Sequence, residues 1–355
     1  MTLFSKDNPF PARLKHREPL TAPDSDKQSH HVELDLTGSG LTYEPGDCVA
    51  ILPTNTPDVV DRTLEALGGD DSLRPFLTHE ANVSHISKGL LRLLATRIPH
   101  LAPLLERNNR TQLKHFIDQH EVWDLLETYG NPFTPQEICA KLTKLVPRYY
   151  SIASSMAEVG DEVHLTVRHV DYTSRDIRRL GVCTHLLCER APLDTTLPLY
   201  IHSADHFRLP EDDATPIIMI GPGTGVAPYR AFLQERLARG ASGKNWLFFG
   251  EWTRSGHFFY EPLWQRLIDQ NKLRLTTAFS RDQAHKVYVQ DRMREHADEI
   301  FRWLEEGATL YVCGDAHSMA PAVEQTLLDI VAPHADPKSY LKSLRQTGRY
   351  LKDVY

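Results

Sequence analysis

The chain has 355 residues, more than one hydrophobic core usually serves, and the length predicts two domains. Its 41% hydrophobic and 25% charged residues are ordinary for a globular protein, and a formal net charge of −7 argues against a nucleic acid partner. No apolar run approaches the roughly 18 residues of a membrane helix, and the first residues lack the apolar segment of a secretory signal. We therefore expect a cytoplasmic protein with no membrane partner.

The cysteine and histidine patterns predict free thiols and no metal site. The cysteines are odd in number and include no CxxC pair, which disfavours a disulfide framework and a zinc ribbon; they are Cys48, Cys139, Cys183, Cys188 and Cys313. His202 and His206 are four residues apart, but the stretch around them lacks the usual zinc-binding contexts.

The first half of the chain has the pattern of a small antiparallel β-barrel. The stretches HHVELDLTGSG and YEPGDCVAIL contain strand formers bounded by Gly and Pro turns, and EVHLTVRHV alternates as a half-exposed strand does. Between these strands, about residues 56–144 are rich in helix formers and predict a helical insertion. We assign this first domain to residues 1–212.

The second half predicts an open α/β domain over residues 213–355. Short apolar runs such as TPIIMIG, NWLFFGEW and ATLYVCGD alternate with helical segments of ten or more residues. A parallel sheet covered on both faces requires this pattern, because each strand is buried on both sides. The boundary falls near LPEDDATP, where acids and prolines separate the two patterns.

Four motifs suggest ligand contacts. In IIMIGPGTGVAPYRAF, Gly221, Gly223 and Gly225 follow an apolar strand and precede a helix, where backbone N–H groups favour a pyrophosphate; the same spacing also suits a tight turn. Beyond a later strand, AFSRDQAHKVYVQ clusters groups that suit a phosphate monoester such as the 2′-phosphate of NADP(H): Ser280, Arg281, Lys286, Tyr288 and Gln290. A solvated polar loop is the alternative for that stretch.

The third motif, PRYYSIASS, joins a guanidinium for a phosphate, rings that can stack on a flat ligand, and a hydroxyl; a barrel strand with buried tyrosines explains it equally well. The residues concerned are Arg148, Tyr149, Tyr150 and Ser151. A second possible anion-binding turn lies in RRLGVCTHLL, where a helix can begin between Gly181 and Thr184.

The chain resembles the diflavin reductases, the family that includes cytochrome P450 reductase and the flavoproteins of NADPH sulfite reductase. The resemblance rests on the order of the motifs above, followed by LYVCGDAHSMA and RYLKDVY. The resemblance runs from about Tyr43 to Tyr355. It implies a ferredoxin-NADP reductase-like fold, α/β plus β-barrel, with FAD on the barrel and NADPH on the α/β domain.

The resemblance also implies a role for each motif. FAD contacts would come from Arg148, Tyr149, Tyr150, Ser151, Thr166, Val167, Arg168, Tyr172, Gly181, Val182, Cys183, Thr184 and the last residue, Tyr355, whose ring would cover the isoalloxazine. NADPH contacts would come from Gly221, Gly223, Thr224, Gly225, Ser280, Arg281, Lys286, Val287, Tyr288, Val289 and Gln290. The hydride path would be surrounded by Ser151, Cys313 and Asp353.

Two positions depart from the family pattern: Ala322 stands where an acid is usual and Arg168 replaces a small residue. The chain also leaves no room for an FMN domain before its barrel, so we expect any FMN half to be another polypeptide.

The expected activity is an FAD-dependent NADPH reductase whose electrons pass to a separate protein, either a sulfite reductase haemoprotein or a flavodoxin-like FMN protein. The alternatives are a ferredoxin or flavodoxin NADP reductase and a non-catalytic flavin-binding regulatory subunit.

Overall fold

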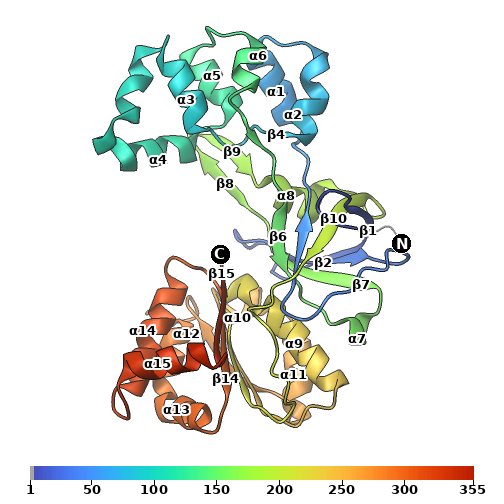
Figure 1. Ribbon diagram of the computed structural model, residues 1–355, viewed down its shortest axis with the longest axis vertical. Coiled ribbons are helices and arrows are strands. Elements are labelled where there is room, and N and C mark those ends of the chain that lie inside the picture. Colours follow the sequence, from blue (N-terminus) through green and yellow to red (C-terminus); the bar gives the residue numbers. More distant parts are fainter. Residues whose placement is uncertain (1–3) are drawn as a thin grey trace. The chain divides into compact units, whose positions relative to one another are not determined.

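The computed structural model describes residues 4–355, which form two compact units (Figure 1). One unit contains the segment that ends at Ala50, together with Tyr149–His169 and Ala191–Tyr355. The other contains Ile51–Arg148 and Val170–Arg190. No helix within residues 4–355 is long and apolar enough to cross a membrane.

The first sheet of the larger unit closes into a barrel. Its strand order is β6 (Arg148–Ser151), β3 (Cys48–Ile51), β10 (Thr196–His202), β1 (Phe10–Pro19), β2 (Ser29–Asp35) and β7 (Glu162–Arg168). The pairs β10/β1, β1/β2 and β2/β7 are antiparallel. A bridge between Ile152, directly after β6, and Leu165 in β7 joins the two outer strands. Alternate residues point inward, so that Val32 and Leu34 of β2 are fully buried beside Val163 and Leu165 of β7.

The second sheet of this unit is parallel throughout its five strands. The order is β13 (Arg274–Phe279), β12 (Asn245–Glu251), β11 (Ile217–Ile220), β14 (Thr309–Gly314) and β15 (Tyr350–Val354). The order reverses between β11 and β14, which is the point where ligands bind open α/β sheets, outside the carboxyl ends of the strands.

Helices cover both faces of the parallel sheet (Figure 1). On one face Ile218, Trp246 and Val312 pack against helices that follow the later strands, namely α12 (Val289–Glu295), α13 (Ala297–Glu305), α14 (Met319–Val331) and α15 (Pro337–Gln346). On the other face Met219 and Phe249 pack against α9 (Ala227–Ala238) and α11 (Glu261–Asp269). Because every strand is buried on both sides, the apolar runs of the sequence do not alternate.

The smaller unit is mainly helical. It contains α1 (Pro57–Leu67), α2 (Arg74–His79), α3 (Lys88–Ala95), α4 (Arg110–Gln119), α5 (Val122–Tyr129), α6 (Pro135–Cys139) and α8 (Val182–His185), with short turns of 3₁₀ helix at Asp71–Leu73, Pro99–Leu105 and Arg107–Asn109. Two short ribbons accompany them: β4 (Ala81–Asn82) with β5 (Thr143–Lys144), and β8 (Asp171–Ser174) with β9 (Ile177–Leu180). A π-helical turn at Leu186–Arg190 ends the unit.

Polar side chains fix the ends of these helices and one ribbon. Thr56, Ser87 and Thr134 accept hydrogen bonds from the first turns of α1, α3 and α6, which satisfies N–H groups that have no partner inside a helix. In β9, the buried Arg179 pairs with Glu121 and Asp124 at the start of α5. The ribbon β8/β9 is therefore held against the helices by charge pairing as well as by packing.

The predicted fold class, a β-barrel with a parallel α/β sheet, is confirmed. The domain boundaries at residue 212 and at about 56–144 stay predictions.

Candidate active site

A glycine-rich turn follows β11 and opens α9. A Cβ atom on Gly221 would lie 2.4 Å from the carbonyl oxygen of Gly225, and one on Gly225 would lie 2.2 Å from the carbonyl oxygen of Cys313. Gly223 has a φ of 58°, which non-glycine residues rarely adopt. The turn therefore packs its backbone directly against the end of β14, at the reversal point of the sheet. Only glycine permits this approach, which brings the start of α9 to the carboxyl end of the sheet, where a helix N-terminus favours an anionic ligand.

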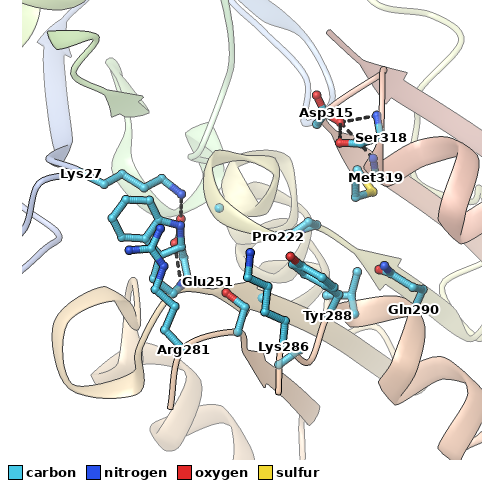
Figure 2. A pocket seen from close by; sticks show the side chains of 16 residues that line it. Lys27, Pro222, Glu251, Arg281, Lys286, Tyr288, Gln290, Asp315, Ser318 and Met319 are labelled. Atoms are coloured by element: carbon cyan, nitrogen blue, oxygen red, sulfur yellow. Dashed lines mark hydrogen bonds and ion pairs between the residues drawn. The ribbon is translucent and has the colours of Figure 1, made fainter. Parts of the chain in front are cut away.

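A pocket of about 470 Å³ opens beside this turn (Figure 2). Seven of the predicted NADPH residues line it: Gly223, Ser280, Arg281, Lys286, Tyr288, Val289 and Gln290. The side chains of Arg281, Lys286 and Tyr288 stand along one wall (Figure 2). Gly221, Thr224, Gly225 and Val287 are not among the lining residues; Val287 is 8% exposed and belongs to the apolar core.

An indole fixes the guanidinium on that wall. The Cζ atom of Arg281 lies 3.3 Å from the ring centroid of Trp252. The backbone N–H of Arg281 donates to the Trp252 carbonyl at 2.7 Å. The Ser280 N–H donates to the carbonyl of Glu251 at 2.8 Å. Stacking limits the motion of the guanidinium while leaving its edge N–H groups available, which suits a phosphate oxygen.

A lysine from the barrel reaches the same pocket. Lys27 donates to the Glu251 carboxylate, whose side chain is 1% exposed, and its ammonium also lies 5.4 Å from the Trp252 ring centroid. The sequence motifs did not reveal Lys27, Glu251 or Trp252, because Lys27 lies in no glycine motif and the other two simply extend the apolar strand β12. The pocket thus combines one buried carboxylate, that of Glu251, with three cationic side chains, those of Lys27, Arg281 and Lys286.

The far side of the pocket contains the start of α14. The Asp315 carboxylate accepts hydrogen bonds from the N–H groups of Ser318 at 2.6 Å and Met319 at 2.9 Å. With the Ser318 hydroxyl, these bonds lower the pKa of Asp315 from its usual 3.8 to about 2. Asp315 lies four residues before the first residue of α14, outside the N-cap position that a local sequence signal marks, and no motif revealed its contacts.

Ser151, Cys313 and Asp353, the predicted residues of the hydride path, lie close together, and their role stays a prediction. The Ser151 hydroxyl, at the end of β6, donates to Asp353 Oδ2 at 2.8 Å, and the Cys313 thiol lies 3.9 Å from the same oxygen. Cys313 and Asp353 are directly paired residues of the parallel ladder between β14 and β15. Burial raises the pKa of the Cys313 thiol well above its usual value, and the nearby Asp353 charge adds to this effect. The thiol therefore stays protonated at neutral pH.

Tyr355 continues the last strand instead of fraying. Its N–H donates to the Gly314 carbonyl at 3.1 Å, and its own carbonyl accepts from Ala316 at 3.0 Å. Its hydroxyl lies 2.9 Å from the Thr224 hydroxyl, and the residue is 61% exposed. The aromatic ring is therefore held beside the glycine-rich turn with much of its surface open to a ligand.

The remaining predicted FAD residues of the larger unit differ in exposure. Tyr149 is half exposed, and its hydroxyl lies 2.9 Å from that of Tyr200, whereas Tyr150 is half-buried. Thr166 and Val167 are buried in β7, and the Thr166 hydroxyl lies 2.7 Å from that of Tyr260. Arg168 is exposed.

In the smaller unit, Gly181 starts the predicted anion-binding turn. A Cβ atom on Gly181 would lie 2.4 Å from the Thr184 hydroxyl, and this hydroxyl accepts from the Val170 N–H at 3.1 Å. Helix α8 begins at Val182, so the N–H groups at its start face no intrahelical acceptor. Tyr172 is half exposed on β8, and Arg148, at the start of β6, donates to the Val146 carbonyl at 2.7 Å. Their contacts to FAD stay predictions.

One histidine cluster has the spacing of a metal site. Ligand atoms of His31, Glu33 and His164 all lie within 4.8 Å of one another on the barrel. The Arg230 guanidinium donates to His164 Nδ1 at 3.3 Å, so a positive charge already faces the cluster. Burial, with the Arg230 charge, lowers the pKa of His31 to about 2 and that of His164 to about 3. The cluster is satisfied by hydrogen bonds, and the Arg230 charge opposes a cation.

Comparisons with known proteins match both halves of the chain. Residues 2–118 match the FAD binding domain family, and residues 219–325 match the oxidoreductase NAD-binding domain family. The chain is similar to proteins named sulfite reductase [NADPH] flavoprotein alpha-component, with 42% identity to that of Bacillus subtilis (strain 168). Identity is 40% to that of Neisseria meningitidis serogroup A and 38% to that of Vibrio cholerae (strain El Tor Inaba N16961).

These alignments cover 99% of the chain but 62%, 61% and 60% of the three relatives, so the chain spans about three fifths of their length. The predicted cofactors, FAD and NADPH, are supported by the two matched domains. The chain therefore contains a region that matches an FAD binding domain family and a region that matches an oxidoreductase NAD-binding domain family, and it is similar over nearly its whole length to these flavoprotein components.

Proposed function

We propose that the protein is an FAD-dependent NADPH reductase that delivers electrons to a separate protein acceptor. The observation that carries the proposal is the hydrogen bond between Ser151 of the barrel and Asp353 of the parallel sheet, with the Cys313 thiol beside it. It brings the strand expected to contact FAD to the sheet edge where a nicotinamide nucleotide is expected. FAD, when bound, accepts a hydride from NADPH and releases electrons one at a time.

The residues present fit both cofactors. The positions that cannot accommodate a Cβ atom, Gly221 and Gly225, form a backbone cradle suited to the pyrophosphate of the nicotinamide nucleotide. The stacked Arg281 and the exposed Lys286 supply the two charges that a 2′-phosphate requires, which favours NADPH over NADH. Gly181 forms a comparable cradle for FAD in the smaller unit.

The chain's own groups supply orientation and charge. Asp353 places a carboxylate where positive charge develops on a nicotinamide that gives up hydride, and a fixed carboxylate stabilises such charge without reorganisation. Ser151 supplies a hydroxyl donor, and Cys313 supplies a protonated thiol at the same point. Tyr355 holds its exposed ring beside the glycine-rich turn through the bond between its hydroxyl and that of Thr224, so a nucleotide that binds this turn must displace the ring.

The proposed acceptor is supported by the relatives' names. Because they are flavoprotein components of sulfite reductase, we propose a haemoprotein as the acceptor and a flavodoxin-like FMN protein as the alternative. Affinity capture of the intact protein from its source distinguishes the two, since the haemoprotein carries a Soret absorbance band and the FMN protein does not. The cytoplasmic location stays a prediction.

A direct test of the proposal uses the released cofactor and an artificial acceptor. Heat-released flavin should chromatograph as FAD in a ratio of about one per chain, and NADPH should support steady reduction of ferricyanide. Protein that binds no flavin, or that binds FMN in equal amount, would overturn the assignment. Protein that binds FAD without ferricyanide reduction would support the regulatory alternative.

A further inference from the structure

A buried carboxylate lies among the cationic side chains of the pocket, although an anionic ligand is expected there. Glu251 ends strand β12, and its side chain is 1% exposed. A carboxylate in this position opposes the binding of a phosphate, because like charges repel more strongly where water is excluded than in bulk water. The charge of Glu251 therefore bears on how tightly the site holds a nucleotide.

Both carboxylate oxygens of Glu251 have partners. Oε1 accepts from the ammonium of Lys27, and Oε2 accepts from the backbone N–H of Trp252 at 2.8 Å. A Cβ atom on Gly223 would lie 3.2 Å from Oε1 of Glu251 and 3.9 Å from Nζ of Lys27. The ion pair therefore lies against the middle of the glycine-rich turn, where the nucleotide pyrophosphate is expected.

The barrel segment that contains Lys27 is tied to the segment that follows β12. The Lys27 N–H donates to the Ser25 hydroxyl at 3.0 Å, and this hydroxyl lies 2.7 Å from His257 Nε2. The Ala22 N–H donates to the Gly256 carbonyl at 2.9 Å. The Lys27 side chain is 15% exposed. The backbone that presents the ammonium to Glu251 is therefore fixed at the pocket.

The charges in the pocket compensate one another in part. Lys27 and Glu251 meet beside Arg281, and Lys286 follows along the same wall (Figure 2). Asp315, on the far side, accepts from N–H groups at the start of α14. Because Glu251 cancels the charge of Lys27, the attraction for a phosphate comes mainly from Arg281 and Lys286.

We propose that Glu251 lowers the nucleotide affinity of this site by neutralising Lys27, and that the oxidised nucleotide leaves faster as a result. The inference rests on the proposed function, which supplies the nucleotide. An uncompensated third cation would bind NADPH and NADP⁺ alike more tightly, which lowers KM without speeding the chemical step. Slow release of the oxidised nucleotide would then limit turnover.

The variants separate the charge of Glu251 from its shape. Glu251→Gln removes the charge and keeps the volume, Lys27→Met removes the opposing charge, and the double variant removes both. Glu306→Gln is the matched control, because Glu306 pairs with Lys244 at 3.5 Å and is not among the residues that line the pocket. The probe is 2′,5′-ADP, which has the 2′-phosphate but no nicotinamide, and its Kd is measured by titration calorimetry on the FAD-containing protein.

Glu251→Gln should lower the Kd for 2′,5′-ADP about 5- to 50-fold at low salt, whereas a merely structural role would leave the Kd unchanged or raise it. Lys27→Met should raise the Kd, and the double variant should lie between the two single variants. Glu306→Gln should stay within about a factor of two of wild type. An unchanged or raised Kd in Glu251→Gln would overturn the proposal. If Glu251→Gln does not fold, the double variant decides, because a Kd no lower than that of Lys27→Met would also overturn it.

Salt dependence and turnover give independent readouts. The Kd of Glu251→Gln should rise more steeply with ionic strength than that of wild type, because one more uncompensated cation acts on the ligand. In ferricyanide reduction, Glu251→Gln should lower KM for NADPH without raising kcat. A KM that stays at the wild-type value would count against the proposal. Wild-type protein that binds no 2′,5′-ADP would instead overturn the nucleotide site of the proposed function.

Discussion

Replacement of Tyr355 should free the nucleotide approach and relax the discrimination between NADPH and NADH. The Tyr355 hydroxyl is bonded to Thr224, which lies within the turn expected to hold the nucleotide pyrophosphate, so this bond must break when a nucleotide binds. Tyr355→Phe removes only the hydroxyl bond. Tyr355→Ala removes the ring as well, while the backbone bonds to Gly314 and Ala316 remain possible.

The two changes differ in expected size. Losing a neutral hydrogen bond that must otherwise be broken lowers the cost of binding by about 0.5–1.5 kcal/mol, which is roughly 2- to 12-fold in affinity. If the Tyr355 ring stacks on the isoalloxazine as the resemblance implies, displacing it costs about 0.5–1.5 kcal/mol more. Tyr355→Ala removes both costs and should therefore raise kcat/KM for NADH by roughly 5- to 150-fold. NADPH should gain less, because kcat/KM of a well-anchored substrate approaches a limit set by association and product release.

The assay is steady-state ferricyanide reduction with both nucleotides, accompanied by the flavin absorbance spectrum. Tyr340→Phe is the control, because its hydroxyl donates to Glu305 on α13 and it lines no part of the pocket. Tyr355→Phe should give an intermediate NADH/NADPH ratio and Tyr355→Ala the highest. An unchanged ratio in both variants, with an unshifted flavin spectrum, would refute the position of Tyr355 in the nucleotide path.

Three further changes test separate parts of the site. Arg281→Ala should raise KM for NADPH about 10- to 150-fold, the loss of about 1.5–3 kcal/mol, and leave KM for NADH within a factor of two; equal effects on both nucleotides would contradict a 2′-phosphate contact. Gly225→Ala places a Cβ atom 2.2 Å from the Cys313 carbonyl, so it should lower the free energy of unfolding in urea by about 1–3 kcal/mol and weaken NADPH binding, and a variant with unchanged values would be unexpected. Asp315→Ala should lower the free energy of unfolding at neutral pH by about 0.5–2 kcal/mol, because the N–H groups of Ser318 and Met319 lose the carboxylate that accepts from them. Because the folded-state pKa of Asp315 is lowered from 3.8 to about 2, the stabilisation is present above pH 3.8 and should disappear as the pH falls towards 2, so a difference from wild type that is independent of pH would contradict the capping role.

Local sequence patterns were sufficient for the strands and the glycine motif. The run IIMI is buried at all four positions because β11 is the central strand of a covered parallel sheet, and Gly221 and Gly225 stand where a Cβ atom has no room. The burial of the run follows from its apolar composition, and the glycine spacing after a strand is a local motif, although the close approach of Gly225 to Cys313 joins distant positions.

Features built from distant segments were not predictable in the same way. Lys27 reaches Glu251 across 224 positions of sequence. Lysine is a common residue type and Lys27 lies in no motif, so no local pattern marks it. The Ser151–Asp353 bond was anticipated only because a family resemblance supplied the pairing, since 202 positions separate the two residues.

The central claim is that hydride passes from NADPH to FAD on this chain. Its most direct test is an anaerobic titration of the purified, FAD-loaded protein with NADPH, followed by flavin absorbance. The account predicts bleaching that is complete within seconds of mixing at saturating NADPH and much slower bleaching with NADH at the same concentration. Flavin that stays oxidised under NADPH, in protein whose bound FAD has been verified, would contradict it.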